Sequence, residues 1–198
     1  ATPVVSVAPT AGGIGYGQTL ADAALSGGTV DVGGSWAFTT PTTRPSAGTA
    51  SYGVTFTPTD TANYLSATST TSVTVTPASL SPNATAGNKP YDGTRSATIT
   101  GRSFTGTVLG GDVVSLTGGS ATFDTAAVGA NKTVTVTGLS LAGTSAGNYQ
   151  LSTTTALTTA SITARPVSLS LSGTTSVASG SAATYIAVRS EEHTSELQ

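Results

Sequence analysis

Apolar and polar residues alternate along much of this chain with a period of two. Tyr52, Val54 and Phe56 are separated by Gly and Thr, and Trp36 and Phe38 share one face across an alanine. Strict alternation places one face of a β-strand in a core and the other face in water. No window carries the i, i+3, i+4, i+7 apolar stripe of an amphipathic helix. The pattern therefore predicts β-strands.

The same alternation continues to the C-terminal part of the chain. It recurs at Val73 and Val75, at Ala97 and Ile99, at Val134 and Val136, and at Val167, Leu169 and Leu171. Threonine dominates the outer faces because its β-branched side chain fits a pleated strand. Short strands between frequent Gly, Pro and Asn turns predict an antiparallel sandwich or barrel. A β-grasp-like sheet, with a short helix at Thr19–Leu25, is the alternative.

One strand pattern changes phase in its middle. Val134 and Val136 share one face of the predicted strand, but Leu139 and Leu141 fall on the other face, and Gly138 lies at the change. A β-bulge at Gly138 would return the two leucines to the core face. We therefore predict a bulge there.

Two short motifs occur twice. Tyr16–Gly17 recurs as Tyr91–Gly93, and Asn63–Tyr64 recurs as Asn148–Tyr149. Each Asn-Tyr pair follows a strong strand and precedes a closing Thr-rich strand. A repeat at this spacing indicates a linear array of similar small domains.

Short Ala/Pro joints follow the two closing strands, at Pro77–Ala78 and Ala164–Pro166. Proline restricts the chain and limits hinge motion at such joints. We therefore expect modules at 1–77 and 78–164, and the start of a third module at 165–188.

The last ten residues differ from the rest of the chain. All three glutamates and the single histidine, His193, lie within 191–198. The segment 189–198, R-S-E-E-H-T-S-E-L-Q, resembles the in-frame translation of a short-read sequencing adapter. We expect read-through here and leave these residues out of the functional argument.

Composition excludes several classes of function. The chain has no cysteine, which excludes disulfides and thiolate chemistry. It also has no methionine, so we expect an internal piece of a longer protein. The net charge of -2 offers no basic surface for nucleic acid or anionic lipid. Apolar runs of a few residues are far shorter than the ~18 that a membrane span needs.

Longer motifs carry a resemblance to known families. In 1–77 they are I-G-Y-G-Q-T-L (14–20), L-S-G-G (25–28), W-A-F-T-T-P (36–41), P-S-A-G-T (45–49) and V-T-F-T-P-T-D-T-A-N-Y (54–64). This part resembles bacterial Ig-like surface repeats of the YGX or MBG type. In 78–164 they are K-P-Y-D-G-T (89–94), G-G-D-V-V-S-L (110–116), A-T-F (121–123), V-G-A-N-K-T-V-T-V-T-G-L (128–139) and A-G-N-Y-Q-L (146–151). This part resembles the YDG domain of filamentous-haemagglutinin-like adhesins, and S-V-A-S-G-S-A-A-T-Y (176–185) resembles the opening of another Ig-like repeat.

The resemblance implies tandem small antiparallel Ig-like β-sandwich modules. It also implies an extracellular or cell-surface location on a bacterium, in a stalk or adhesin, and it transfers no catalytic residue.

The repeated motifs have structural interpretations. For Tyr91-Asp92-Gly93 we predict a turn in which Asp92 caps backbone N–H groups, Gly93 has positive φ and Tyr91 packs under the hairpin. For Asn63-Tyr64 and Asn148-Tyr149 we predict corners with a left-handed Asn and a buried Tyr whose hydroxyl is bonded. A ligand contact at the Tyr91 loop tip is the alternative.

Trp36 and a set of three aspartates each have a structural and a functional interpretation. Trp36, the single tryptophan, is predicted to lie in the core; its alternative is an aromatic platform for a sugar ring. Asp31, Asp60 and Asp112 fall in predicted loops. Calcium binding at a module joint is the alternative to ordinary loop positions, but no D-x-D-x-D loop is present.

Catalytic patterns are missing from the sequence. Outside the tail there is no histidine to act as a base beside serine, and no phosphate-binding glycine motif. The remaining candidate bases, Lys89 and Lys132, fall in turn-like polar segments. We expect no enzyme, and no catalytic, cofactor-binding or metal site.

The sequence thus favours a structural repeat segment, a stalk or spacer of a large secreted or surface-attached protein. Its expected partners are neighbouring modules of the same chain, with no nucleic acid and no membrane insertion. Two alternatives stay open. One is a module that binds host or matrix glycans or proteins, and the other is an accessory segment of a secreted polysaccharide-degrading enzyme.

Overall fold

The computed structural model describes residues 1–173, 179 and 185–189. Over these residues the chain is all-β, as predicted, with no α-helix and two short 3-10 helices. One of them, η1 (Leu20–Asp22), lies inside the segment Thr19–Leu25 that the β-grasp-like alternative assigned to a short helix, and the other is η2 (Ala146–Asn148). None of the described helices is long and apolar enough to cross a membrane. The tail 190–198 lies outside the described residues.

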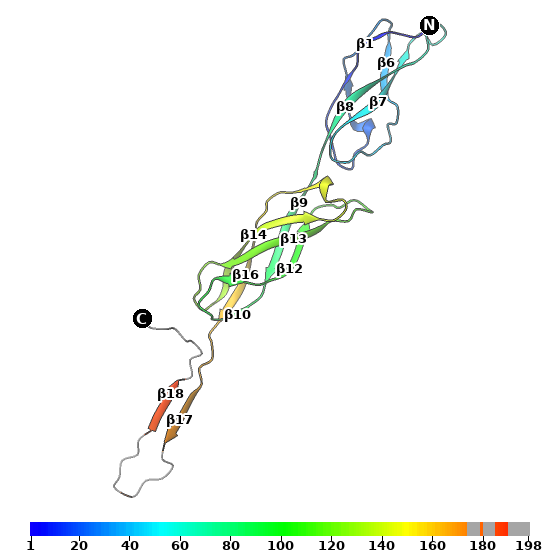
Figure 1. Cartoon of the computed structure of the whole chain (residues 1–198). Helices are drawn as coiled ribbons and strands as arrows, with labels where there is room; N and C mark the ends of the chain where they lie inside the picture. Colours follow the sequence, from blue (N-terminus) through cyan, green and yellow to red (C-terminus); the bar gives the residue numbers. More distant parts are fainter. Residues whose placement is uncertain (174–178, 180–184, 190–198) are drawn as a thin grey trace.

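The first module contains eight strands (Figure 1). They are β1 (Val5–Val7), β2 (Thr10–Ala11), β3 (Ile14–Gly15), β4 (Leu25–Ser26), β5 (Thr29–Val30), β6 (Gly34–Phe38), β7 (Gly48–Pro58) and β8 (Ala67–Thr76). The main sheet has the order β3-β8-β7-β6, and the pairs β1-β5 and β2-β4 form two smaller sheets.

The alternating residues of the first module form its core. Val54, Val73 and Leu20 are fully buried, and Phe38 and Val75 join them in one cluster. Trp36 and Tyr52 are half-buried and pack against its edge. The predicted inward faces of β6, β7 and β8 are therefore confirmed.

The second module also contains eight strands. They are β9 (Ala78–Ala86), β10 (Lys89–Pro90), β11 (Ser96–Ala97), β12 (Ile99–Thr105), β13 (Ser115–Phe123), β14 (Gly129–Ala142), β15 (Tyr149–Leu151) and β16 (Ala156–Thr163). A sheet of order β10-β16-β14-β13-β11 packs on a sheet of order β12-β9-β15. The core between them includes Phe123, Val134 and Val136, all fully buried.

The sheets are mixed, not purely antiparallel as predicted. In each module a two-residue strand near the module's start, β3 or β10, runs parallel to the closing strand, β8 or β16. Strand β15 also runs parallel to β9. These strands are too short to carry a detectable alternation, and the pattern of a strand does not reveal its direction.

The phase change in β14 has a different cause from the one predicted. Leu139 is buried, as expected, but the pairing has no bulge: Gly118 pairs with Leu139, and Ser120 pairs with Thr137. One residue lies between in each strand, Gly119 and Gly138, so the register is unchanged. Both have positive φ, 91° and 76°. The two paired glycines, both with left-handed backbone, thus reverse which face of each strand points to the core at the same place. Alanine would disfavour this backbone conformation.

A last pair of strands follows the second module. β17 (Leu169–Gly173) pairs antiparallel with β18 (Tyr185–Arg189). The predicted inward position of Val167 is wrong, since this residue precedes the strand and is 57 % exposed. The predicted third-module motif at 176–185 lies largely outside the described residues.

The paired glycines generate a stability prediction. Gly138→Ala should cost about 1–2 kcal/mol, because its Cβ meets nothing within 4 Å and only the left-handed backbone is penalised. Gly119→Ala should cost more, since its Cβ would also lie 3.0 Å from Leu139 Cδ2 and 3.1 Å from Val136 Cγ1. Native-state hydrogen exchange of the Val136 amide measures both effects.

Gly110→Ala is the matched control, because Gly110 lies in an open loop with no atom within 4 Å of the added Cβ. Its effect should stay within about 0.5 kcal/mol. Equal effects for all three substitutions would contradict the paired-glycine account.

Candidate functional site: the junction between the two modules

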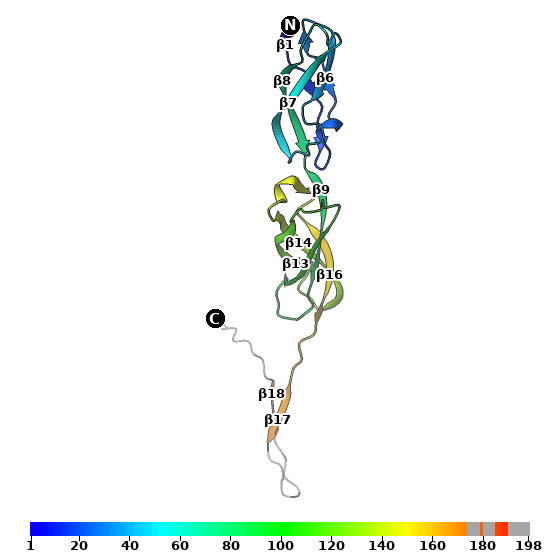
Figure 2. The same ribbon diagram turned by 90° about the vertical axis from the view of Figure 1, so that its right-hand side faces the viewer.

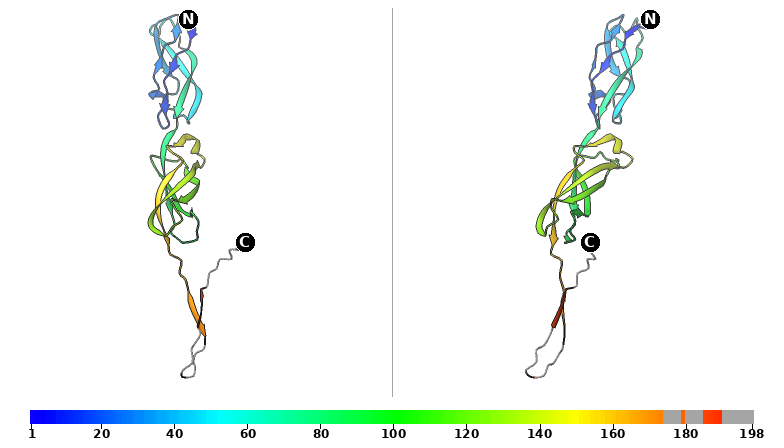
Figure 3. Two further views of the ribbon diagram at one scale, coloured as in Figure 1. Left: turned by 90° about the vertical axis from the view of Figure 1, so that its left-hand side faces the viewer. Right: turned by 60° about the vertical axis from the view of Figure 1, so that its left-hand side comes forward.

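The two modules lie end to end and are joined by a short connection (Figures 2 and 3). Strand β8 ends at Thr76 and β9 begins at Ala78, so only Pro77 lies between the strands. Proline fixes its own φ and restricts the residue before it. The covalent connection is therefore short and stiff.

Tyr16 is presented at this end of the first module by the parallel pairing of β3 with β8. Its backbone N–H donates to the Thr76 carbonyl oxygen at 2.9 Å, beside the point where the chain leaves the module. The Thr76 hydroxyl donates to the Ile14 carbonyl at 3.3 Å, and Gly17 turns the chain with a φ of 97°. These contacts hold the Tyr16 side chain at the junction.

The second module receives Tyr16 with Asp112 and Tyr149. Asp112 lies in the loop between β12 and β13, and Tyr149 is the first residue of β15. The Tyr149 side chain is 5 % exposed. Its hydroxyl donates to Asp112 Oδ2 at 2.5 Å and accepts the Leu109 backbone N–H at 2.9 Å. The acceptor is thus fixed within its own module.

The contact between the modules completes this arrangement. The Tyr16 hydroxyl donates to the same Asp112 Oδ2 at 2.8 Å, across 96 residues of sequence. The rings of Tyr16 and Tyr149 meet edge to face, with centroids 5.4 Å apart and planes at 75°. This geometry is favourable for aromatic pairs. One carboxylate oxygen therefore binds two tyrosines from different modules.

A second contact lies beside the first. The Ala47 backbone N–H, from the loop before β7, donates to the Asn148 side-chain oxygen at 2.9 Å. Leu109 also packs against Gly17, since a Cβ added to Gly17 would lie only 3.0 Å from Leu109 Cδ1. Separate points of contact oppose rotation of one module about Pro77 as well as bending.

The electrostatics of the site favour docking near neutral pH. Hydrogen bonds from Tyr149 and then Tyr16 hold the pKa of Asp112 below its ordinary value of 3.8. Burial, followed by the Asp112 carboxylate, raises the pKa of Tyr16 and of Tyr149 above 10.0. The hydrogen bonds to Asp112 therefore weaken as pH falls through the lowered pKa of Asp112, or as pH rises through the raised pKa values of the tyrosines.

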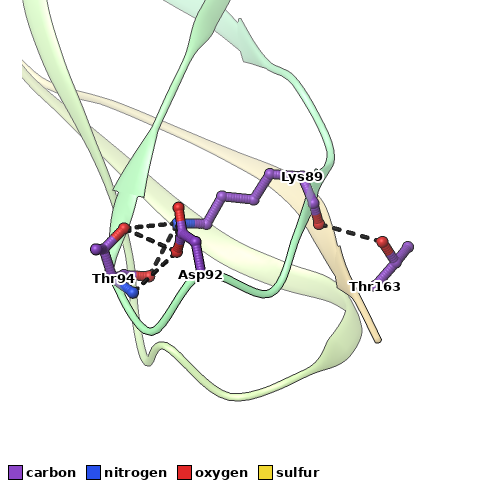
Figure 4. Close-up of polar contacts among 4 residues, drawn as sticks. All are labelled: Lys89, Asp92, Thr94 and Thr163. Atoms are coloured by element: carbon purple, nitrogen blue, oxygen red, sulfur yellow. Dashed lines mark hydrogen bonds and ion pairs between the residues drawn. The ribbon is translucent and has the colours of Figure 1, made fainter. Parts of the chain in front are cut away.

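The Tyr91-Asp92-Gly93 turn follows β10, which lies at the other end of the second module (Figure 1), and Figure 4 shows the contacts of Asp92. Asp92 Oδ1 accepts the Thr94 backbone N–H at 2.9 Å and binds the Lys89 ammonium at 2.8 Å. The lysine is the main cause that lowers the pKa of Asp92 to about 2. Gly93 has a φ of 78°. The predicted cap and the predicted glycine conformation are confirmed.

The predicted position of Tyr91 under the hairpin is wrong. Tyr91 is 44 % exposed. The Lys89 side chain, only 16 % exposed, takes the inner position, with its ammonium 5.7 Å from the centroid of the buried Phe123 ring. A lysine two residues before the tyrosine therefore fills the space that we assigned to the aromatic ring.

The Asn-Tyr corners follow the prediction only in part. The Tyr149 ring is buried with its hydroxyl bonded, whereas Tyr64 is half-buried. Neither asparagine is left-handed; among the described residues other than glycine, Asn131 has positive φ. Both act through their side chains: Asn63 donates to Asp60 and Asn148 accepts from Ala47.

The remaining candidates lie apart from one another. Asp31 accepts the Val4 backbone N–H and Asp60 binds Asn63, both in the first module away from the junction, while Asp112 binds the two tyrosines. The described residues hold no group of three or more potential metal ligands.

The Trp36 ring lies 5.2 Å from the Phe56 ring, measured between ring centroids. The candidate bases are both ion-paired, Lys89 with Asp92 and Lys132 with Asp124.

The sequence predicted an ordinary loop position for Asp112 and left calcium binding at a module joint as the alternative. It missed the link from Tyr16 to Asp112, because contacts between modules leave no trace in strand periodicity. The available signal was the repeat itself, which puts an aromatic residue near both ends of each module.

Tyr16→Phe should raise the pKa of Asp112 toward 3.8, because one of the two hydroxyls that stabilise the carboxylate is removed. NMR titration of the Asp112 side-chain carboxyl carbon measures the shift. Tyr64→Phe, at the opposite end of the first module, is the control and should change nothing. An Asp112 pKa that does not respond to Tyr16→Phe would show that the modules do not dock in solution.

One comparison with known proteins, that with sequence profiles of families, bears on the second module. Residues 76–156 match the sequence profile of the YDG domain. No curated protein matches the chain. Among solved structures, a variant of titin domains I67–I69, a chain of three Ig domains, is similar over 94 % of this chain and 87 % of that chain, with 11 % identity and a TM-score of 0.29. The second module therefore contains a YDG domain, and Asp112, Asn148 and Tyr149 of the junction lie within it.

Proposed function

We propose that this chain is a spacer segment of a bacterial stalk, in which docked modules hold a distal part of a surface protein away from its anchor. The observation that carries the proposal is the shared Asp112 acceptor, which fixes one module on the next. In this proposal the first module is an Ig-like repeat of the YGX or MBG type. The whole belongs to a secreted or surface-attached protein similar to filamentous-haemagglutinin-like adhesins.

The separate cores of the modules support a spacer role. The buried clusters of the two modules share no residue. Each module therefore gains its stability from its own sheets, and the junction adds orientation. Such an array extends by addition of modules, because each new module needs only the end of the preceding one.

The threonine-rich surface supports the same role. Hydroxyls pair across neighbouring strands, at Thr39 and Thr55, at Thr49 and Thr74, and at Thr85 and Thr100, with oxygen–oxygen distances of 2.9–3.0 Å. Cross-strand pairs of this kind stabilise a sheet by about 0.2–1 kcal/mol each. These hydroxyl pairs stabilise the sheets without adding charge to the surface. An uncharged, hydrated surface suits a segment with few specific partners.

The binding alternative has one candidate location. A hollow of about 350 Å³ lies beside Gly119 of β13, lined by Ser96, Ile99, Arg102 and Ser120 among others. The Arg102 Nε already donates to the Gly118 carbonyl at 2.7 Å. Direct glycan or protein binding would place a ligand here, whereas a spacer leaves the hollow without one. A role as an accessory segment of a polysaccharide-degrading enzyme depends on domains outside this chain.

Distance measurement between spin labels tests the spacer proposal. The chain has no cysteine, so Ser72→Cys and Thr159→Cys give one exposed label on each module. We expect a narrow distance distribution for the otherwise natural chain. Asp112→Ala should broaden it at least twofold, because both tyrosine hydroxyls lose their acceptor.

Asp60→Ala is the matched control, since it removes a hydrogen-bonded aspartate far from the junction and should leave the width unchanged. A broad distribution in the natural sequence would reject the spacer proposal. Saturable glycan binding that Arg102→Ala abolishes would favour the binding alternative instead.

A further inference from the structure

The C-terminal end of the second module repeats the local structure that presents Tyr16 at the junction. The Tyr91 backbone N–H donates to the Thr163 carbonyl oxygen at 2.8 Å, as Tyr16 does to Thr76 at 2.9 Å. In both modules the threonine is the last residue of the closing strand. Tyr91 therefore stands beside the point where the chain leaves the second module.

The strands around the two tyrosines also correspond. Lys89–Pro90 runs parallel to Ile162–Thr163, as Ile14–Gly15 does to Val75–Thr76. The Thr163 hydroxyl donates to the Lys89 carbonyl at 3.3 Å (Figure 4). The Thr76 hydroxyl donates to the Ile14 carbonyl at the same distance. Backbone pairing and side-chain contacts thus place Tyr91 as the equivalent of Tyr16.

The two tyrosines differ in what covers them. Tyr16 packs against Tyr149 and binds Asp112, whereas Tyr91 is 44 % exposed. Val128 is 53 % exposed, and its neighbour Gly129 pairs with Ile162, so Val128 flanks the same exit. The end of the second module thus presents an aromatic and an aliphatic side chain where the end of the first module is docked.

We propose that Tyr91 and Val128 form a docking surface for the module that follows residue 164 in the same chain. This inference rests on the proposed spacer function and extends its junction to the next module. The occupant is a neighbour in the chain, because the equivalent surface of the first module is covered by the module that directly follows it. Five residues, 164–168, separate β16 from β17, against one at the first junction. A longer connection constrains less, so orientation here depends more on docking.

The chemistry of the occupant follows from the first junction. It presents a carboxylate or amide oxygen to the Tyr91 hydroxyl, beside the edge of an aromatic ring. One position differs between the two tyrosine motifs, which bears on how the occupant fits. Asp92 follows Tyr91 where Gly17 follows Tyr16, and Leu109 seats against Gly17. The residue that takes the place of Leu109 must therefore fit beside Asp92, whose carboxylate is already bound by Lys89 and Thr94.

Chemical protection of Tyr91 tests the proposal. The probe is tetranitromethane, applied to the 198-residue chain and to the same gene segment extended through the end of the following module. Nitration at each tyrosine is followed by peptide mass spectrometry. We expect Tyr91 to react at least fivefold more slowly in the extended protein. Tyr64, at the opposite end, is the internal control and should react equally in both. Equal Tyr91 rates in the two proteins would overturn the proposal.

A variant separates docking from incidental burial. In the extended protein, Tyr91→Ala should broaden the spin-label distance distribution between the second and third modules, and should leave the distribution across the first junction unchanged. A protected Tyr91 whose removal changes neither distribution would also overturn the proposal. Tyr16 distinguishes this failure from that of the spacer function. If Tyr16 reacts more slowly than Tyr64 but Tyr91 does not slow in the extended protein, only the proposed second docking surface is refuted. If Tyr16 reacts as fast as Tyr64, docking at the first junction is refuted as well.

Discussion

The arrangement of this protein depends on one carboxylate oxygen that accepts hydrogen bonds from two tyrosines of different modules. Near neutral pH Asp112 is ionised and its two donors are protonated, because the pKa of Asp112 lies below 3.8 and the pKa values of both tyrosines lie above 10.0. The Tyr149 hydroxyl has both of its partners within the second module and so holds Asp112 in place, whereas the Tyr16 hydroxyl reaches this acceptor in the docked state. The short link at Pro77 keeps the partners close, and the shared acceptor selects one orientation.

The scaffold around the junction is built to present these groups. Short parallel strands bring Tyr16 to the exit of the first module, and β15 brings Tyr149 to the entry of the second. Within the second module, the paired glycines Gly119 and Gly138 turn two strands over together and keep Leu139 in the core. Local backbone chemistry thus determines which side chains reach the ends of each module.

Strand periodicity predicted the all-β fold and most of the core, because burial of one strand face is a local property of the sequence. Residues such as Val54, Val73 and Val134 were therefore identifiable. The junction was not, because Tyr16 and Asp112 are 96 residues apart and their contact depends on how two folded bodies meet. The exposed position of Tyr91 was missed for a related reason: Lys89 competes for the same space, and no alternation pattern records such a competition.

The central claim is that the two modules form one aligned unit in solution. Residual dipolar couplings of backbone amides, measured for both modules in one weakly aligning medium at neutral pH, test it most directly. We predict that a single alignment tensor fits the couplings of 5–76 and 78–163 together, with the Tyr16 and Asp112 side chains in contact. Two tensors of clearly different magnitude would show independent motion of the modules and would contradict the account.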